Sequence, residues 1–524
     1  MHASSKVRVR LALLTLLPLL AHCAGAPHLE GVEPSQAIPA ADTSRVDHAV
    51  IAELGDHPDE SGVRLLEDNA LAFAYRAATA EAAGRSLDVQ YYIWKDDLTG
   101  RLLASELMRA AERGVRVRLL IDDADGRAKH DIFRIADQHP LIEVRIFNPF
   151  YNRYGSIAKI GEFLLRGSRL NRRMHNKAWI VDNRMAILGG RNIGDEYFGA
   201  SPHSNFADLD VIVTGPIVAD VSREFDEYWN SENAVPVSRF DSREPKPGEL
   251  DNLIRLARDY PSTAGDAPYF AALRDERKRA ELIRQAPAAL KVRDIRLLVD
   301  APTKIGEPKQ KAEPSRVLSG LDSTIDQASH ETLIISPYFV PGEEGALSLV
   351  RDVERGMRVA VLTNSLAATD VAAVHTGYAR YRRDLLRGGV ELYEMKRKVG
   401  DPDARRQVSV LGSSGATLHT KAMVIDQRWA FIGSMNIDPR SANLNTEMGV
   451  LVDSPELAQQ LRRQFELTTS PDLSYHVVLE EHEGLVWYDR VKGKARRTEN
   501  EPDASILERM GVTLLRLVPI ESQL

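Results

Sequence analysis

Two short stretches of the chain carry the same chemically active side chains at the same spacing. HNKAWIVD occupies residues 175–182, and HTKAMVID occupies residues 419–426. In an extended strand, residues two apart point the same way, so each histidine shares a face with a lysine, Lys177 or Lys421. An imidazole can attack phosphorus, and an ammonium group can stabilise negative charge on phosphate oxygens. The pattern therefore predicts phosphoryl-transfer chemistry.

Each stretch continues into a glycine-rich segment that ends in asparagine, GGRN or GSMN. The polar residues after the first stretch predict a tight hairpin with Asn183 and Arg184 as its two turn residues. In that register the histidines and lysines lie opposite residues of the glycine-rich strand. The predicted pairs are His175 with Asn192, Lys177 with Gly190, His419 with Asn436, and Lys421 with Ser434. Each hairpin would then present an imidazole, an ammonium group, an amide and a small residue on one surface.

The aspartate that ends each stretch has a different predicted role. Asp182 and Asp426 lie at an odd offset from their histidines, so their side chains should point to the other side of the strand. We therefore expect structural roles for both aspartates, tying the turn or the sheet, and do not expect them to donate protons to a substrate.

The duplication of the histidine has a chemical reason. One imidazole can form a covalent phosphohistidine while a second protonates the leaving oxygen and then deprotonates the incoming alcohol or water. A single match to this pattern would mean little, because most histidines on strands are core or surface residues. Two matches with the same continuation, inside a larger repeat, favour a catalytic pair, His175 and His419.

The repeat that must position these residues is a whole domain. Residues 88–123 resemble residues 333–365, and the tripeptide ERG recurs at Glu112 and Glu354. Each copy has the pattern of a strand, a loop, an amphipathic helix and a second apolar strand, which predicts βαβ units and parallel strands. We expect an α/β protein with domains at residues 64–235 and 291–524, joined by a helical connector at residues 236–290.

The start of the chain has the pattern of a secretory signal. Basic residues in MHASSKVRVR precede the apolar run LALLTLLPLLA, which predicts a signal peptide over residues 1–26 and a tether over residues 27–63. Two cleavage sites remain open. LLAHC resembles a lipoprotein signal in which Cys23 would be lipidated, although His22 stands where a small residue is usual, while Ala24–Ala26 fits ordinary signal peptidase.

Composition narrows the range of functions. The chain has 524 residues, of which 43% are hydrophobic and 27% are charged, and this is typical of a folded globular protein. Its formal net charge of −7 gives no general attraction for nucleic acid. Cys23 is the only cysteine, which excludes a disulfide within the chain.

The two stretches resemble the HxKxxxxD motif of the phospholipase D superfamily, and their surroundings resemble the bacterial cardiolipin synthases, especially the C-type branch. The resemblance implies two α/β/α sandwich domains related by a pseudo-twofold axis, one active site at their interface, a phosphatidyl-histidine intermediate, and no obligatory metal or other cofactor. It also implies which residues act. The implied catalytic residues are His175, Lys177, Asp182, His419, Lys421 and Asp426, and the implied substrate-binding residues are Asn192, Asn436 and Ser434.

The resemblance also implies an acidic residue beyond each motif that orients a histidine. Aligning DLDVIV with EMGVLV identifies these supporting residues as Asp208 and Glu447. By family analogy His175 is the nucleophile and His419 the acid and base. Gly190 departs from the family pattern, which often has serine there, and we expect the loss of that hydroxyl to be tolerable.

The resemblance implies a phosphatidyltransferase that makes cardiolipin from phosphatidylglycerol and a second phospholipid such as phosphatidylethanolamine. Three alternatives remain: a phospholipase D that transfers the same intermediate to water, a nuclease of the same superfamily, and a membrane-binding protein with a relict site. The acidic balance and the signal favour a lipid enzyme over a nuclease. We expect an exported protein that is associated with a membrane surface in the bacterial cell envelope.

Overall fold

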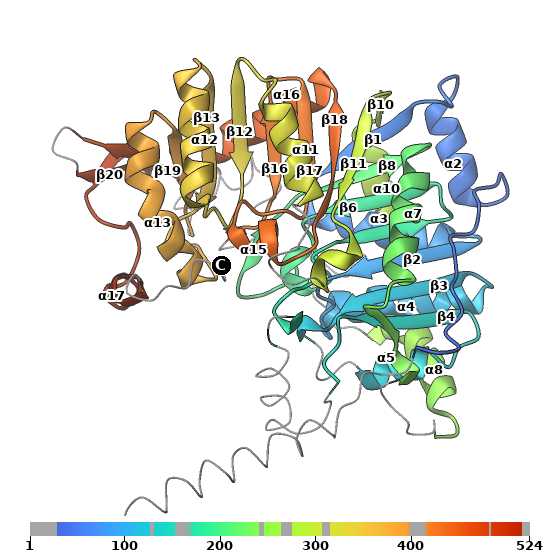
Figure 1. Ribbon diagram of the computed structural model, residues 1–524. Coiled ribbons are helices and arrows are strands. Elements are labelled where there is room, and N and C mark those ends of the chain that lie inside the picture. The colour runs from blue at the N-terminus through green and yellow to red at the C-terminus, as the bar shows by residue number, and fades with distance from the viewer. Residues whose placement is uncertain are drawn as a thin grey trace, which may run out of the picture.

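The computed structural model describes two mixed β-sheets that lie side by side, each with helices packed against it (Figure 1). The described residues are 29–125, 130–151, 167, 169–239, 246–263, 275–306, 315–397, 416–480 and 484–515. The predicted signal peptide, including Cys23, lies outside them. Among the helices in the described residues, none combines the length and the hydropathy needed to span a bilayer.

The first sheet has nine strands in the order β10-β1-β8-β6-β5-β2-β3-β4-β9. Their bounds are β1 Ser61–Leu66, β2 Ser86–Tyr91, β3 Arg116–Asp122, β4 Ile142–Phe147, β5 Ala178–Val181, β6 Met185–Gly189, β8 Asp210–Thr214, β9 Ala234–Pro236 and β10 Leu290–Val292. Strands β2, β3 and β4 are parallel, and the other pairings are antiparallel.

The second sheet repeats this topology and extends it. Its order is β11-β18-β17-β16-β12-β13-β14-β19-β20-β21, with β12, β13 and β14 parallel. The bounds are β11 Ile295–Val299, β12 Glu331–Ile335, β13 Arg358–Asn364, β14 Glu391–Met395, β16 Ala422–Ile425, β17 Trp429–Gly433, β18 Met448–Asp453, β19 Ser474–Leu479, β20 Leu485–Val491 and β21 Lys494–Thr498. The βαβ units predicted from the repeat are confirmed in both halves.

Helices cover both faces of each sheet. In the first half, α3 (Asn69–Ala82) and α4 (Leu98–Glu112) pack on the outer face, and α7 (Ile217–Trp229) packs on the inner face. In the second half, α11 (Arg316–Ile325), α12 (Gly342–Glu354) and α13 (Ala372–Arg387) are outside, and α16 (Pro455–Thr468) is inside. Further helices of the two halves are α5 His130–Ala136, α15 Pro439–Asn443 and α17 Ile506–Leu515.

One continuous apolar core joins the inner faces of the two halves. Ile180 and Leu188 from the first sheet belong to the same buried cluster as Val424 and Ile432 from the second. Strands β7 (Asn205–Ala207) and β15 (Ala416–Leu418) also pair across the halves, as a parallel two-stranded sheet. The expected architecture of two α/β/α sandwiches joined face to face is confirmed.

The prediction of a tether over residues 27–63 is wrong for the residues that the structure describes. Helix α2 (Arg45–Leu54) begins at a capping box in which Ser44 and Asp47 exchange hydrogen bonds. Val46, Val50 and Leu54 lie at helical spacing and are buried against the first half. The segment is rich in proline, alanine and polar residues, which favours a tether. The helix that packs here has a narrow apolar stripe of only three residues.

The connector predicted at residues 236–290 does contain helices, but the boundaries differ. Helices α8 (Glu249–Thr263) and α10 (Glu276–Gln285) pack against α4 and α3 of the first half. Strand β10 then pairs with β1 at the edge of the first sheet, so the first half ends at Val292 and the second sheet begins at Ile295. The first half thus holds the connector and begins before residue 64.

The predicted register of the two hairpins is wrong by one residue. Val181 pairs with Met185, and Ile425 pairs with Trp429, so each loop has three residues instead of two. Asp182 and Asp426 begin these loops with φ of 52° and 53°. The predicted strand pairs His175 with Asn192, Lys177 with Gly190, His419 with Asn436, and Lys421 with Ser434 do not form. In both halves the histidine and lysine precede the paired strand, which begins at Ala178 or Ala422.

Candidate active site

The two predicted histidines enter the site from opposite halves, and each backbone is held by the other half. The His175 N–H donates to the carbonyl oxygen of Thr446 at 2.9 Å, and the His419 N–H donates to that of Ala207 at 2.8 Å. Each accepting residue immediately precedes a supporting acid. The short segments before β5 and β16 are thereby fixed against the opposite half at the interface.

The supporting acids cross the interface as well. His175 Nδ1 lies 2.8 Å from Glu447 Oε2, and His419 Nδ1 lies 2.6 Å from Asp208 Oδ2. Both carboxylates are fully buried. A carboxylate accepts from an Nδ1–H, which leaves Nε2 of each ring as the atom for a substrate. Neither half therefore contains a complete histidine–acid pair.

Aromatic rings fix the planes of the two imidazoles. The ring of Tyr92 lies edge-on to His175, with centroids 5.1 Å apart. The rings of Tyr197 and Phe206 lie 5.3 Å and 4.9 Å from that of His419. No sequence pattern marks Tyr197 or Phe206 as site residues, because their contacts with His419 arise only when the two halves meet.

Two buried lysines lie beside the histidines. Lys177 Nζ donates to the carbonyl oxygen of His175 at 2.5 Å, and Lys421 Nζ donates to that of His419. Each lysine side chain is about 1% exposed, so its ammonium group has exchanged water for these few partners. Burial lowers the pKa of both lysines, that of Lys177 to about 7. An anion bound here would favour the charged forms.

The four basic groups share one electrostatic environment. Burial is the largest cause of the lowered pKa of His175, and the charges of Lys177 and Lys421 lower it further. Burial and Lys421 also lower the pKa of His419, while Asp208 acts in the opposite direction. Because each lysine acts on both imidazoles, the predicted residues of the two halves form a single site.

The two acids differ in protonation. Burial raises the pKa of Glu447 to about 7, against the opposing charge of Lys177. Burial also acts to raise the pKa of Asp208, but His419 and Lys421 outweigh it, and the pKa of Asp208 is lowered. The Asp208–His419 pair thus has a firmly ionised carboxylate, whereas Glu447 titrates near neutrality.

The two predicted asparagines have different surroundings. Asn192 accepts from the Ile93 N–H at 3.1 Å and donates to the Tyr197 hydroxyl at 2.9 Å, so it links the loop after β2 to the surroundings of His419. Asn436 is about 5% exposed, and its side-chain oxygen is buried with no hydrogen-bond partner among the described residues. The Asn436 side chain can therefore still bind a ligand, whereas both the oxygen and the nitrogen of the Asn192 amide already form hydrogen bonds.

The surroundings of Ser434 and Gly190 explain why the first half has glycine where the second half has serine. The Ser434 hydroxyl donates to Glu447 Oε2 at 2.5 Å and accepts from the Met448 N–H at 3.0 Å. At Gly190, a Cβ atom would lie 2.2 Å from Asp208 Oδ1. The shorter acid of the first half therefore occupies the space of a side chain at residue 190, and glycine is required there.

The motif aspartates have the structural role that we expected. Asp182 accepts hydrogen bonds at 2.7–2.9 Å from the backbone N–H groups of three consecutive residues, 84–86. Asp426 accepts from those of residues 329–331 at 2.7–3.1 Å. Each aspartate ties its hairpin turn to the start of β2 or β12. Their side chains engage backbone groups at the end of the strand remote from the histidine.

The described part of the chain holds no cluster of three or more histidine, cysteine, aspartate or glutamate side chains that could bind a metal ion. The site instead consists of two imidazoles, two ammonium groups, two carboxylates, two amides and a hydroxyl, drawn from both halves. Such a set can supply a nucleophile, a proton donor and positive charge around a phosphate.

Comparison with known proteins gives a consistent result. The family model described as "Cardiolipin synthase, PLD-like domain" matches residues 77–229 and 321–468. The chain is 42% identical over 480 residues to cardiolipin synthase C of Escherichia coli strain K12, covering 91% of this chain and 99% of that protein. It is 26% identical over 410 residues to cardiolipin synthase A of Pseudomonas entomophila, covering 77% and 67% of the two chains.

Among solved structures, phosphatidylserine synthase from Haemophilus influenzae shares the fold. Its TM-score is 0.54 at 14% sequence identity, and the match covers 91% of this chain and all of that one. At this identity the likeness concerns the fold alone.

Proposed function

Because the chain belongs to the family of cardiolipin synthases with PLD-like domains, we propose that it is a phosphatidyltransferase that makes cardiolipin from phosphatidylglycerol and a second phospholipid. One observation carries the mechanism. Two imidazoles from opposite halves meet in one site, and each Nδ1 is held by a carboxylate of the other half. This arrangement leaves two Nε2 atoms for the two sides of one phosphodiester.

In the first step, Nε2 of one histidine attacks the phosphorus of the donor phospholipid. A nitrogen–phosphorus bond forms, and the bond from phosphorus to the headgroup oxygen breaks. The second histidine gives its Nε2 proton to that leaving oxygen, which departs as an alcohol. The product is a phosphatidyl-histidine with the acceptor site free.

In the second step, the headgroup hydroxyl of phosphatidylglycerol is the acceptor. The second histidine takes the hydroxyl proton, the oxygen attacks phosphorus, and the nitrogen–phosphorus bond breaks to release cardiolipin. Water in place of this hydroxyl would give phosphatidic acid. The outcome depends on whether the lipid hydroxyl or water reaches the intermediate.

We assign the attack to His175 and the proton transfers to His419. Burial and the two lysines lower the pKa of His175 well below its usual value, so its ring is neutral with a lone pair available. Burial also lowers the pKa of His419, but the ionised carboxylate of Asp208 opposes this and favours the protonated ring, which suits a residue that must take up and release a proton. The difference between the acids supports the assignment made from the family resemblance.

The lysines and Asn436 are proposed to bind the non-bridging phosphate oxygens. Lys177 and Lys421 are buried in a site of low dielectric, where their charges act strongly on the charge that accumulates during transfer. The Asn436 side-chain oxygen has no partner among the described residues, so a flip of the amide would lose no hydrogen bond of that oxygen and would place the NH₂ group there to donate to a phosphate oxygen.

The proposal is tested by incubating the purified protein with labelled phosphatidylglycerol, alone and with phosphatidylethanolamine. We expect labelled cardiolipin whose yield depends on the second lipid, and no product from the double variant His175→Ala, His419→Ala. Release of phosphatidic acid with no cardiolipin would identify a hydrolase instead, and cleavage of nucleic acid with neither lipid product would overturn the proposal.

We also propose that the protein is exported and associates with a membrane surface of the cell envelope. The basic residues and apolar run at the start of the chain support export. Cell fractionation of the unaltered protein and a Cys23→Ser variant tests the route of attachment. Loss of the variant from the membrane fraction would support lipidation, and recovery of the unaltered chain in the cytoplasm would contradict export.

A further inference from the structure

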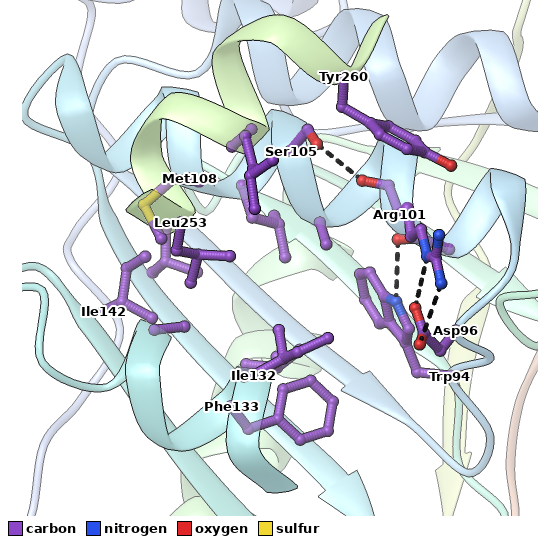
Figure 2. Close-up of a pocket in the computed structure, with 18 of the residues that line it drawn as sticks. Trp94, Asp96, Arg101, Ser105, Met108, Ile132, Phe133, Ile142, Leu253 and Tyr260 are labelled. Carbon is purple, nitrogen blue, oxygen red and sulfur yellow. Dashed lines mark hydrogen bonds and ion pairs between the residues drawn. The ribbon is translucent and has the colours of Figure 1, made fainter. Parts of the chain in front are cut away.

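A pocket of about 360 Å³ lies in the first half, between α4, α5, β3 and helix α8 of the connector (Figure 2). No step of the proposed reaction uses it. Its volume is at the lower end of the roughly 300–1,000 Å³ that ligand pockets span. It has room for one flexible chain and not for a whole diacyl lipid.

The pocket is amphipathic along its length. Figure 2 shows Asp96, Arg101 and Tyr260 at one end, and Met108, Leu253 and Ile142 at the other. Arg101 pairs with Asp96 at 2.7 Å, and its side chain is 53% exposed. The polar end is therefore open to solvent and carries an ion pair, while the walls beyond it are aliphatic and aromatic.

The polar end adjoins the active site. In the segment that follows β2, the ring of Tyr92 contacts the ring of His175, and two residues later Trp94 lines the pocket. The N–H of Ile93, which lies between them, donates to the Asn192 side-chain oxygen, and the N–H of Lys95, which follows Trp94, donates to the Ile193 carbonyl oxygen at 2.8 Å. One short loop thus forms a wall of both the active site and the pocket.

We propose that this pocket holds one acyl chain of a phospholipid substrate whose phosphate lies at the histidine pair. The inference rests on the proposed function and adds a site for the lipid tail. An amphipathic pocket with its polar end toward the phosphate site matches a molecule with a polar head and an apolar tail. The connector helix α8, which contributes Leu253, Leu256 and Ala257, gains a role as one wall of this lipid site.

The occupant is best identified by cross-linking, because this readout does not depend on turnover. Phosphatidylglycerol with a diazirine on one acyl chain is photolysed with the full-length protein, and the labelled peptides are mapped. We expect label on residues of α4 and α8, such as Met108 and Leu253. Unlabelled phosphatidylglycerol should compete the label away. Labelling elsewhere, or equal competition by a free fatty acid, would overturn the proposal.

Two variants fill the pocket from opposite walls, Ala104→Phe on α4 and Ala257→Phe on α8. Each methylene that leaves water for an apolar wall strengthens binding roughly fourfold, so displacing two of them costs roughly fifteenfold. We expect each variant to lower kcat/KM for long-chain relative to short-chain phosphatidylglycerol at least tenfold, and to reduce the label in the pocket. An unchanged ratio in both variants would overturn the proposal.

The matched control is Ala52→Phe, which places the same side chain on an exposed position of α2. It should leave both the ratio and the labelling unchanged. Thermal unfolding of the three variants excludes a general loss of folding. If the protein makes no cardiolipin but is still labelled in the pocket, the proposed function fails alone; if it makes cardiolipin and the label is elsewhere, the pocket inference fails alone.

Discussion

The two halves of the molecule share a topology and a motif, yet each depends on the other to complete its histidine. Asp208 of the first half holds His419 of the second, and Glu447 of the second holds His175 of the first. A half on its own would have a histidine without its acid and an acid without its histidine. The exchange explains why the duplicated motif must act as a pair across one interface.

The halves are not equal in detail. The first combines Gly190 with an aspartate, and the second combines Ser434 with a glutamate. The pKa of Asp208 is lowered, whereas burial raises that of Glu447 to about 7. The two halves therefore share a fold, but their imidazoles have different surroundings. The proposed two-step transfer needs this difference, because one histidine attacks phosphorus and the other transfers protons.

The largest predicted effect breaks the pair itself. His175→Ala and His419→Ala should each lower kcat for cardiolipin synthesis by about 10⁴-fold or more, since they remove a nucleophile or a proton donor. Steady-state assay with labelled phosphatidylglycerol checks this. The exposed His48 on α2 provides a matched control, and His48→Ala should keep normal activity. Wild-type turnover in either site variant would refute the shared mechanism.

The next prediction concerns the two acids, each of which binds the histidine of the other half. Glu447→Gln and Asp208→Asn should each lower kcat roughly 10²–10⁴-fold, because the orienting carboxylate is lost. With ¹⁵N-labelled histidine, Glu447→Gln should shift the NMR signals of His175 and spare His419, and Asp208→Asn should do the reverse. If each acid instead perturbed the histidine of its own half, the exchange of acids between the halves would be refuted.

Exchanging the glycine and the serine beside the two acids tests whether the halves differ at this position. Gly190→Ser places a Cβ where Asp208 lies, and should displace that acid from His419 and lower kcat by about 100-fold. Ser434→Gly removes one hydrogen bond to Glu447 and should cost less than about tenfold. Kinetics of the two variants side by side test this order. Equal losses would show that the two positions are interchangeable.

The lowered pKa of Lys177 predicts an alkaline limb in the pH profile. Lys177 is an ammonium group below about pH 7 and loses its charge as the pH rises through that value. Since kcat/KM reports the free enzyme, it should fall about tenfold per pH unit on the alkaline side. Lys177→Gln should have low activity and a less steep alkaline limb, because only His419 and Lys421 would then lose their protons there. A wild-type profile that stays flat to pH 9 would contradict the lowered pKa.

The smallest effect on catalysis is expected at the motif aspartates, whose loss should act on stability. Asp182→Ala removes the acceptor of three backbone N–H groups in a buried position and should cost about 3 kcal/mol. Asp426→Ala should cost less, about 1–2 kcal/mol, because water can reach its half-buried site.

Denaturant unfolding gives both stability losses, and kcat of the folded fraction should stay within about threefold of the wild type. Asp182→Asn, which keeps an acceptor oxygen, provides the conservative control. A loss of kcat comparable to that of the histidine variants, without a loss of stability, would give the aspartates a direct chemical role.

Local patterns predicted much of the fold and most of the side chains that gather in the site. The βαβ repeats follow from the alternation of apolar strands with amphipathic helices, and each histidine and lysine lies where its strand begins. The hairpin register failed because Asp182 and Asp426 adopt positive φ and add a residue to each loop. The exchange of acids could not be read from the sequence, since an alignment of the halves shows which carboxylates correspond but not which histidine each one reaches.

The central claim is that both halves act on one phosphodiester through a single covalent histidine. Its most direct test is to trap labelled phosphatidyl groups on the protein by rapid acid-free denaturation and to map the labelled peptide. We predict at most one adduct per chain, on His175, absent from His175→Ala and accumulating in His419→Ala when the donor has a leaving group that needs no proton. Adducts on both histidines of one chain, or none on either, would contradict the account.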